Sequence, residues 1–256
     1  MKSFRPFIFV ICGLLLGGVA LIAGYAGARA GRHYEYNYLC CGMAKRHNIL
    51  ISLKESLALV RFPSQIGQDR WVAEVVFPGV TNGFFIDVGS ADGFVNSNTW
   101  ALERRGWSGI CVDPFPTSMG ARTCRMFKDA VDSVSGRKVS FVAAGETGGI
   151  TNHLNSGKDA VERAPTVTLT TVTLADILHR AAAPPFIHFL SLDIEGAELE
   201  ALRGFPFEEY KVGAMAIEHN YEEPKRTQID ALLKAHGYKR ARTWMQDDFY
   251  VAAGLR

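Results

Sequence analysis

The stretch Phe84-Phe85-Ile86-Asp87-Val88-Gly89-Ser90-Ala91-Asp92-Gly93-Phe94 decides the fold that we expect for this chain. Its first half is an apolar run that stops at a carboxylate, as a buried β-strand does, and a loop with a glycine near each end follows. Residues 95–102 then have the pattern of a helix start. A strand, a glycine loop and a helix in this order form the first turn of α/β folds that receive a nucleotide-like ligand.

The loop itself differs from the dinucleotide-binding fingerprint G-x-G-x-x-G, because Ala91 and Asp92 stand where that motif needs further glycines. Gly89 and Gly93 are free to adopt backbone conformations closed to other residues, and they leave room for a ligand. An ordinary connection between a strand and a helix could have the same sequence pattern. The other predicted strands are therefore needed to decide whether this loop binds a ligand.

Three further apolar runs end in an acidic residue: 109–112 before Asp113, 186–192 before Asp193, and 212–217 before Glu218. The carboxyl ends of parallel strands meet at one edge of a sheet, and open α/β folds bind ligands there. We therefore expect these three carboxylates to lie at the same edge as Asp87.

Asp113 stands at a position with a known use in nucleoside-binding folds. It follows the glycine loop by about 20 residues, where an acidic side chain accepts hydrogen bonds from ribose hydroxyls. An aspartate of a simple turn is the alternative, because Pro114 comes directly after it.

The composition is that of one α/β domain with an appendage. The chain has 256 residues and a net charge of +2, so a nucleic-acid partner is not expected. Its five cysteines, at positions 12, 40, 41, 111 and 124, lack the spacing of metal ligands. Cys111 lies in an apolar run and is expected to be a buried thiol. For Cys40 and Cys41, a disulfide, lipidation and two unmodified thiols remain open.

Residues 7–28 contain no charged side chain and are long enough, at about 22 residues, to span a bilayer as a helix. Basic residues flank the segment on both sides, so the positive-inside rule does not choose its orientation. A cleavable signal peptide is the alternative, since Ala26-Gly27-Ala28 resembles a cleavage site. The length favours a retained anchor. We expect an anchor at 1–30, a juxtamembrane linker and helix at 31–61, and a catalytic domain at 62–256.

Together these features resemble the FkbM family of S-adenosylmethionine-dependent methyltransferases. The matching segments cover roughly residues 62–253 in the order of the family: Ser64-Gln65, Gln68-Asp69, 85–93, Asn98-Thr99, 106–109, Asp113-Pro114, 191–198, Glu218-His219-Asn220 and Gly237-Tyr238. The most distinctive block is Ser191-Leu192-Asp193-Ile194-Glu195-Gly196-Ala197-Glu198. Two departures are a short segment at 114–125 and Asp113 where relatives often have Glu.

The resemblance implies the Rossmann-like α/β fold of class I methyltransferases, with a mostly parallel seven-stranded sheet and helices on both faces. The expected N-terminal transmembrane helix precedes this domain and lies outside the resemblance. It implies S-adenosylmethionine as the cofactor, with Asp113 on the ribose and 129–132 near the adenine. Carried over by position, the cofactor-binding residues are Gln68, Asp87, Gly89, Ser90, Ala91, Asp92, Gly93, Asn98, Asp113, Pro114, Ala130 and Asp193.

The resemblance also implies methyl transfer to a hydroxyl, often of a sugar or a secondary metabolite. Such an in-line displacement needs alignment and, for an unactivated hydroxyl, a base. The predicted catalytic residues are Asp193, His219, Glu218 and Glu195. A structural role for His219 and a helix-capping role for Glu195 are the alternatives. A divalent cation held by Asp193, Glu218 and His219 is a further alternative, although nothing in their spacing requires a metal.

We thus expect a single-pass, membrane-anchored O-methyltransferase with a small-molecule or glycan acceptor. The cytosolic supply of the donor favours a catalytic domain on the cytosolic side, whereas Cys40-Cys41 and the signal-peptide alternative favour the other side. The acceptor stays open, because acceptor pockets are built from variable loops such as 145–165. An inactive methyltransferase fold that serves as a binding module is the alternative function. The retained glycine loop and Asp113 favour the enzyme.

Overall fold

The computed structural model of the protein describes residues 61–154 and 163–255. The expected membrane anchor and the linker lie outside these residues, so the division of the chain into three parts stays a prediction. Within the described ranges, no helix has the length and apolar character needed to cross a membrane.

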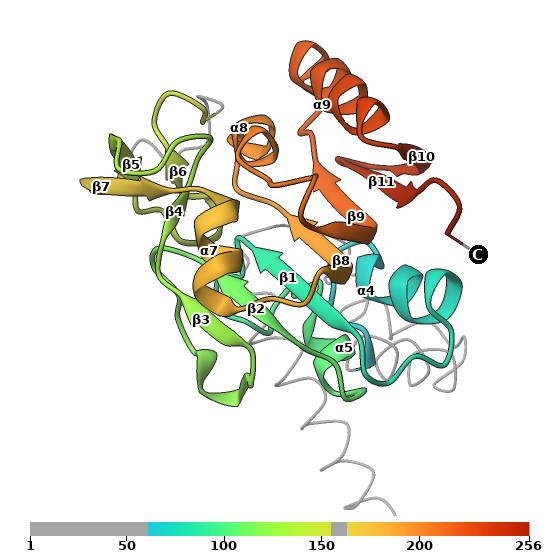
Figure 1. Cartoon of the computed structure of the whole chain (residues 1–256). Helices are drawn as coiled ribbons and strands as arrows, with labels where there is room; N and C mark the ends of the chain where they lie inside the picture. Colours follow the sequence, from blue (N-terminus) through green and yellow to red (C-terminus); the bar gives the residue numbers. More distant parts are fainter. Residues whose placement is uncertain (1–60, 155–162, 256) are drawn as a thin grey trace, which may run out of the picture. The chain divides into compact units, whose positions relative to one another are not determined.

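A seven-stranded sheet with the order β10-β11-β9-β8-β1-β2-β3 forms the centre of the domain (Figure 1). The strands are β1 (Phe84–Val88), β2 (Ser108–Val112), β3 (Arg125–Phe127), β8 (Phe186–Leu192), β9 (Lys211–Glu218), β10 (Tyr238–Trp244) and β11 (Asp247–Ala252). Neighbours from β3 to β9 pair in parallel, whereas β11 is antiparallel to both β9 and β10. The sheet is therefore mixed, and parallel strands form its larger part.

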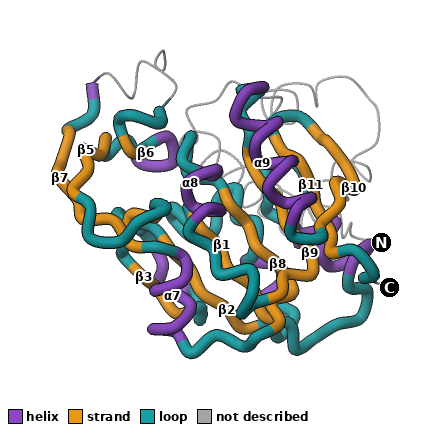
Figure 2. Tube along the Cα trace, turned by 45° about the horizontal axis from the view of Figure 1, so that its top comes forward, coloured by secondary structure: helices purple, strands orange, loops and turns teal. Residues whose placement is uncertain are grey.

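Three helices cover one face of this sheet: α7 (Leu174–Ala181), α8 (Glu198–Arg203) and α9 (Glu223–Ala235). They lie along the same side of the strands in Figure 1 and in Figure 2. Ile177 of α7, Leu202 of α8 and Leu233 of α9 belong to one apolar core with Ile86 and Ile110 of the sheet.

The other face is covered by α4 (Gln68–Trp71), its π-helical continuation η2 (Val72–Val76), and α5 (Trp100–Glu103). Trp71 and Leu102 pack there against Phe85 and Phe189. Phe85 and its neighbour Ile86 thus enter different cores, because successive side chains of a strand point to opposite faces. This explains why β1 is apolar along nearly its whole length.

A smaller sheet stands beyond the β3 edge, with the order β4-β7-β5-β6. It is built from β4 (Ala130–Val131), β5 (Lys138–Val142), β6 (Gly149–Ile150) and β7 (Thr166–Val172), with the short helical turns η3 (Met119–Ala121) and η4 (Gly145–Thr147) in the loops nearby.

The predicted helix start at 95–102 is wrong in its first half, because α5 begins only at Trp100. The side chain of Asp92 accepts hydrogen bonds from the N–H groups of Phe94 and Val95, at 2.9 and 2.8 Å. These local bonds hold the backbone in turns and compete with a helix.

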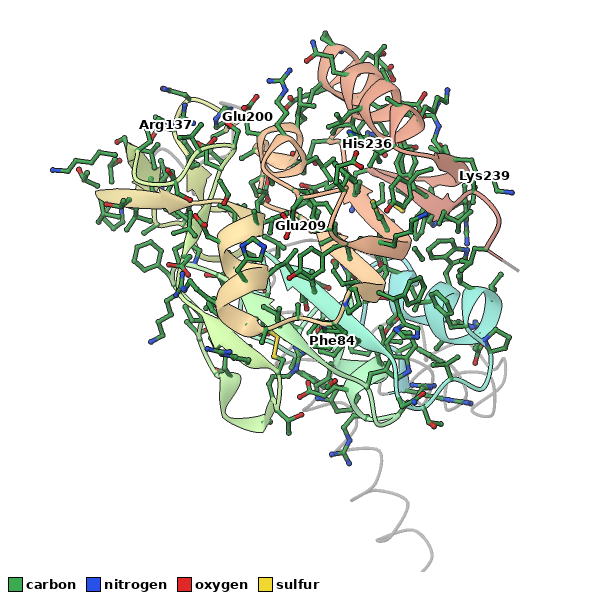
Figure 3. All side chains as sticks on the ribbon, viewed as in Figure 1. Phe84, Arg137, Glu200, Glu209, His236 and Lys239 are labelled. Carbon is green, nitrogen blue, oxygen red and sulfur yellow. A yellow bond between two sulfur atoms is a disulfide. The ribbon has the colours of Figure 1, made fainter. Side chains whose placement is uncertain are left out.

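The predicted free thiol at Cys111 is also wrong. Cys111 forms a disulfide with Cys124, with 1.99 Å between the two sulfur atoms (Figure 3). The bond ties β2 to the segment just before β3. The two cysteines are 13 positions apart, and only the pairing of β2 with β3 brings them together.

Reduction of this disulfide should destabilise the domain. Opening a loop of this size restores chain entropy to the unfolded state, which is worth roughly 3 kcal/mol. We expect the urea midpoint of the full chain to fall when a reductant opens the bond. The double variant Cys111→Ala/Cys124→Ala is the control, because a reductant should leave its midpoint unchanged. An unchanged midpoint in the natural protein, with thiol titration proving reduction, would contradict the prediction.

Candidate functional site

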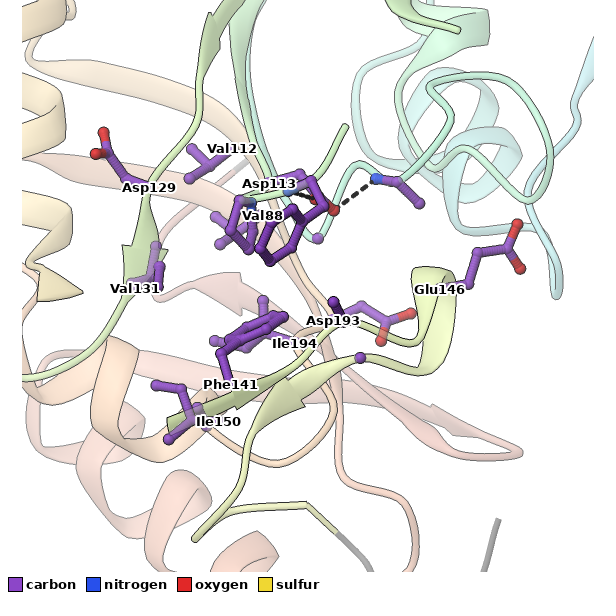
Figure 4. A pocket seen from close by; sticks show the side chains of 18 of the residues that line it. Val88, Val112, Asp113, Asp129, Val131, Phe141, Glu146, Ile150, Asp193 and Ile194 are labelled. Carbon is purple, nitrogen blue, oxygen red and sulfur yellow. Dashed lines mark hydrogen bonds between the residues drawn. The ribbon is translucent and has the colours of Figure 1, made fainter. Parts of the chain in front are cut away.

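A cleft opens at the carboxyl ends of β1, β2 and β8. It holds about 610 Å³ of empty space, part of which is open solvent. Gly89, Asp113 and Asp193 line it from the large sheet, and Phe141 and Ile150 line it from the small sheet. In Figure 4 the labelled apolar side chains form one group, and the carboxylates of Asp113 and Asp193 lie on the same side of that group.

Gly89 lets the end of β1 come very close to the end of β8. Its φ is 90°, and a Cβ added to it would lie only 1.7 Å from the carbonyl oxygen of Asp193. The N–H of Asp193 donates to the carbonyl of Val88 at 3.0 Å. Only glycine fits this approach, so the first residue of the loop fixes Asp193 at the wall of the cleft.

Asp87 lies beneath the glycine loop and does not line the cleft. Its buried carboxylate accepts a hydrogen bond from Thr99 Oγ1. Burial raises its pKa, and the nearby positive charge of Arg122 opposes the rise. Asp87 therefore holds the far end of the loop in place.

Arg122 is a loop-holding residue that sequence reasoning missed. Its guanidinium forms a buried ion pair with Glu103 and donates to the carbonyl of Gly93 and to Thr99 Oγ1, both at 2.8 Å. It comes from the 114–125 segment, which had looked abbreviated. Five donors in a fixed fork suit arginine to joining several acceptors, but no local sequence pattern indicates this role.

Asp113 lines the cleft in a fixed orientation. One of its oxygens accepts from the N–H of Ala91 at 3.0 Å, and the other accepts from the N–H of Phe115 at 2.7 Å. Burial raises its pKa, and these two hydrogen bonds oppose the rise. Each oxygen keeps a lone pair for a ligand hydroxyl.

The apolar part of the cleft lies between the large and the small sheet. Of the predicted segment 129–132, the residues Asp129, Ala130 and Val131 line it. Asp132 instead forms an ion pair with Arg137. Phe115 and Phe141, whose ring centres are 5.6 Å apart, provide aromatic surface, as a flat base would require.

Two predicted cofactor residues carry buried atoms without a partner. Ser90 Oγ and Asn98 Oδ1 make no hydrogen bond within the described part of the chain, while Asn98 Nδ2 donates to Ser191 Oγ at 2.9 Å. Buried polar atoms are normally paired, so these two atoms are exceptions within the described residues. Pro114 and Ala91 line the cleft, whereas Gln68, Ser90, Asp92, Gly93 and Asn98 are not part of its lining.

Asp193, which is half-buried and lines the cleft, is hydrogen-bonded to the buried carboxyl group of Glu218, which is not part of the lining. A bond between two carboxyl groups needs a proton, and burial raises the pKa of both. Asn220 Nδ2 donates to Glu218 Oε2 at 2.7 Å and to Glu195 Oε2 at 3.5 Å. The structure thus brings Asp193, Glu218 and Glu195 together.

The loop after β8 is held by Glu198, another residue that sequence reasoning did not single out. Its Oε1 accepts from the N–H groups of Ile194 and Gly196, at 3.1 and 3.0 Å. Its Oε2 forms an ion pair with Lys225 at 3.0 Å. Glu198 therefore orders the loop between β8 and α8.

His219 lies apart from this pair. Its Nδ1 accepts from the N–H of Tyr221 at 3.0 Å, and its Nε2 is 3.9 Å from Asp248. The charges that act on it are those of Asp248, Arg226, Glu223 and Arg240, and burial lowers its pKa. Like Glu218 it does not line the cleft, but unlike Glu218 it makes no hydrogen bond to Asp193 within the described residues, so its catalytic role stays a prediction.

His188 has a structural role within β8. Its Nδ1 accepts from the N–H of Phe84 at 3.1 Å, and its ring packs edge-on against Phe77 and Trp107. For the metal alternative, the described ranges contain no group of three or more His, Cys, Asp or Glu side chains arranged to hold an ion.

The family model described as the methyltransferase FkbM domain matches residues 87–240 of the chain. This span runs from the end of β1 into β10 and contains Asp113, Asp193, Glu218 and the small sheet. No curated protein matches the chain.

The carboxyl pair should make stability fall as pH rises. Because the folded protein holds its protons more tightly than the unfolded chain, stability is greatest below the unfolded pKa of about 4 and declines up to the raised folded values. We expect Asp193→Asn to be more stable than the natural protein at pH 9, with a smaller difference at pH 5. Urea unfolding at both pH values measures this. A difference of the same size at both would contradict the raised pKa of the pair.

Proposed function

Because this chain belongs to the FkbM methyltransferase family, we propose that it is an S-adenosylmethionine-dependent O-methyltransferase acting on a hydroxyl of a sugar, a glycan or another small metabolite. One observation supports the donor and the hydroxyl acceptor, which family membership alone does not specify. Asp113 and Asp193 both line the cleft, and Asp193 is hydrogen-bonded to the carboxyl group of Glu218. The oriented carboxylate of Asp113 suits a nucleoside, and the Asp193–Glu218 pair suits proton transfer.

The residues of the cleft fit the donor. Asp113 has free lone pairs for two ribose hydroxyls, and Phe115, Phe141 and Ala130 offer an apolar slot for the adenine. S-adenosylmethionine supplies, when bound, a methyl group already activated on a sulfonium.

The protein itself has to align the donor with the acceptor and to remove one proton from the acceptor hydroxyl. With a single proton between them, Asp193 and Glu218 together carry one negative charge, so the pair accepts the proton that the acceptor hydroxyl loses and becomes neutral. Burial raises the pKa of the pair toward the working pH, where a general base is most effective. Asn220 fixes Glu218 by its hydrogen bond of 2.7 Å.

The charges around the pair limit the acceptor. Glu195, Glu198 and Asp247 all act on Asp193 with the same sign, and the ammonium of Lys225 is taken by Glu198 and Glu222. A phosphate or carboxylate on the acceptor would be repelled here. We therefore infer a neutral, hydroxylated acceptor.

For the location, we propose a membrane-anchored enzyme, and the disulfide now bears on its orientation. Structural disulfides persist in oxidising compartments and are rare in the cytosol. Cys111–Cys124 therefore supports a domain on the non-cytosolic side, against the cytosolic side that donor supply favours. Protease protection in intact membranes distinguishes the two orientations.

Donor binding should depend on Asp113. We expect isothermal calorimetry of the full-length protein to detect S-adenosylmethionine, and Asp113→Asn to bind it roughly 10- to 100-fold more weakly, because hydrogen bonds to a charged group contribute about 1.5–3 kcal/mol. The exposed Glu209→Gln is the matched control and should bind as the natural protein does. Absence of binding by the natural protein would favour the inactive binding module instead.

Proton removal should depend on the carboxyl pair and not on His219. We expect Glu218→Gln to lower methyl transfer by about 100-fold, within the usual range for a general base, while donor affinity holds. His219→Gln should keep most of the activity. The measurement is transfer of a labelled methyl group to an acceptor found by screening neutral polyols and glycosides. Loss of transfer in His219→Gln with full activity in Glu218→Gln would reverse the assignment.

A further inference from the structure

Two glutamines of the family-like segment at 64–69 do not reach the donor cleft, and they fasten the turn between β10 and β11 instead. Gln65 Oε1 accepts from Gln246 Nε2 at 2.8 Å, and Gln68 Nε2 donates to Asp247 Oδ2 at 2.8 Å. The other end of the Gln68 amide accepts from the N–H of Ile66 at 3.1 Å. Gln68 is 2% exposed, so its amide is committed to Asp247 and to its own turn.

Asp247 stands beside the carboxyl pair. It lies directly opposite Glu218 in the antiparallel pairing of β11 with β9, and side chains at opposite positions project from the same face. The next residue, Asp248, points to the other face, where Arg226 and Arg240 bind it at 2.7 and 2.9 Å. These two arginines thus bind Asp248, whereas Asp247 is hydrogen-bonded to the neutral amide of Gln68.

The other charged groups that face the pair come from the loop after β8 and from α8. They are Glu195 and Glu198, and Lys225 of α9 neutralises part of the charge of Glu198. Asp247 is 4% exposed. Burial raises its pKa to about 6, and the hydrogen bond from Gln68 opposes that rise by favouring the charged carboxylate.

We propose that Asp247 is a positioning residue of the Asp193–Glu218 pair, and that Gln68 holds its carboxylate charged so that the pair keeps one proton at neutral pH. Two fully ionised carboxylates would repel each other and separate, whereas a shared proton joins them and leaves one lone pair facing an acceptor. The catalytic meaning of this arrangement rests on the proposed function, but the arrangement itself is a property of the protein without any ligand.

The test is a pH titration of the carboxyl carbons of the full-length chain by NMR, with labelled Asp and Glu. Asp247→Asn removes the charge and should lower the ionisation midpoint of the pair by about one pH unit, since like charges a few ångströms apart interact by at least this much. Gln68→Met should lower it in the same direction, because Asp247 then loses its hydrogen bond and takes up a proton. The double variant should shift no further than Asp247→Asn alone.

Gln65→Met is the matched control, since it loosens the same turn without touching Asp247. It should leave the titration unchanged. Equal shifts in Gln65→Met and Gln68→Met, or additive shifts in the double variant, would reduce Gln68 to a packing role and overturn the proposal. An unchanged midpoint in Asp247→Asn would overturn it as well. Donor binding measured on the same samples separates this failure from a failure of the proposed function, because neither glutamine lines the donor cleft.

Discussion

The close approach of two strand ends governs this site. The backbone of Gly89 lies so close to the carbonyl oxygen of Asp193 that no side chain would fit between them. The ends of β1 and β8 are joined there by the hydrogen bond from Asp193 N–H to the carbonyl of Val88. The approach places the donor loop and the carboxyl pair at one sheet edge. Other contacts hold these two parts in place. Arg122 and Asp87 support the loop from below, Glu198 accepts hydrogen bonds in the turn after β8, and Asn220 donates to Glu218.

The two halves of the site have opposite electrostatic characters. On the donor side, carboxylates are held by backbone N–H groups or by Arg122, and the surrounding surface is largely apolar. On the acceptor side, carboxyl groups gather with few cations among them, so burial and mutual repulsion favour a retained proton. In the proposed reaction, the apolar half would hold the nucleoside of the donor and the carboxyl pair would accept the proton of the hydroxyl.

Much of the site was predictable because strand periodicity and strand ends are local properties. The apolar runs before Asp87, Asp113 and Asp193 predicted the strands, and parallel pairing predicted that their ends would meet. His219 shows the limit of this reasoning. It directly follows Glu218, but the alternation of side chains across a strand turns it toward Asp248 and away from Asp193. Residue type alone had favoured it as the base.

The sequence by itself determined the α/β class, the order of strands and helices, the glycine at the tight approach and the family. Each of these depends on patterns within a few residues or on motifs in a fixed order. Only the tertiary structure decided that Cys111 pairs with Cys124, that Arg122 holds the loop, and that Gln68 donates to Asp247 and lies outside the lining of the cleft. These contacts join residues that the chain keeps apart, by 179 positions for Gln68 and Asp247. They exist only because the packing of helices on a twisted sheet creates the distances that a hydrogen bond or a disulfide needs.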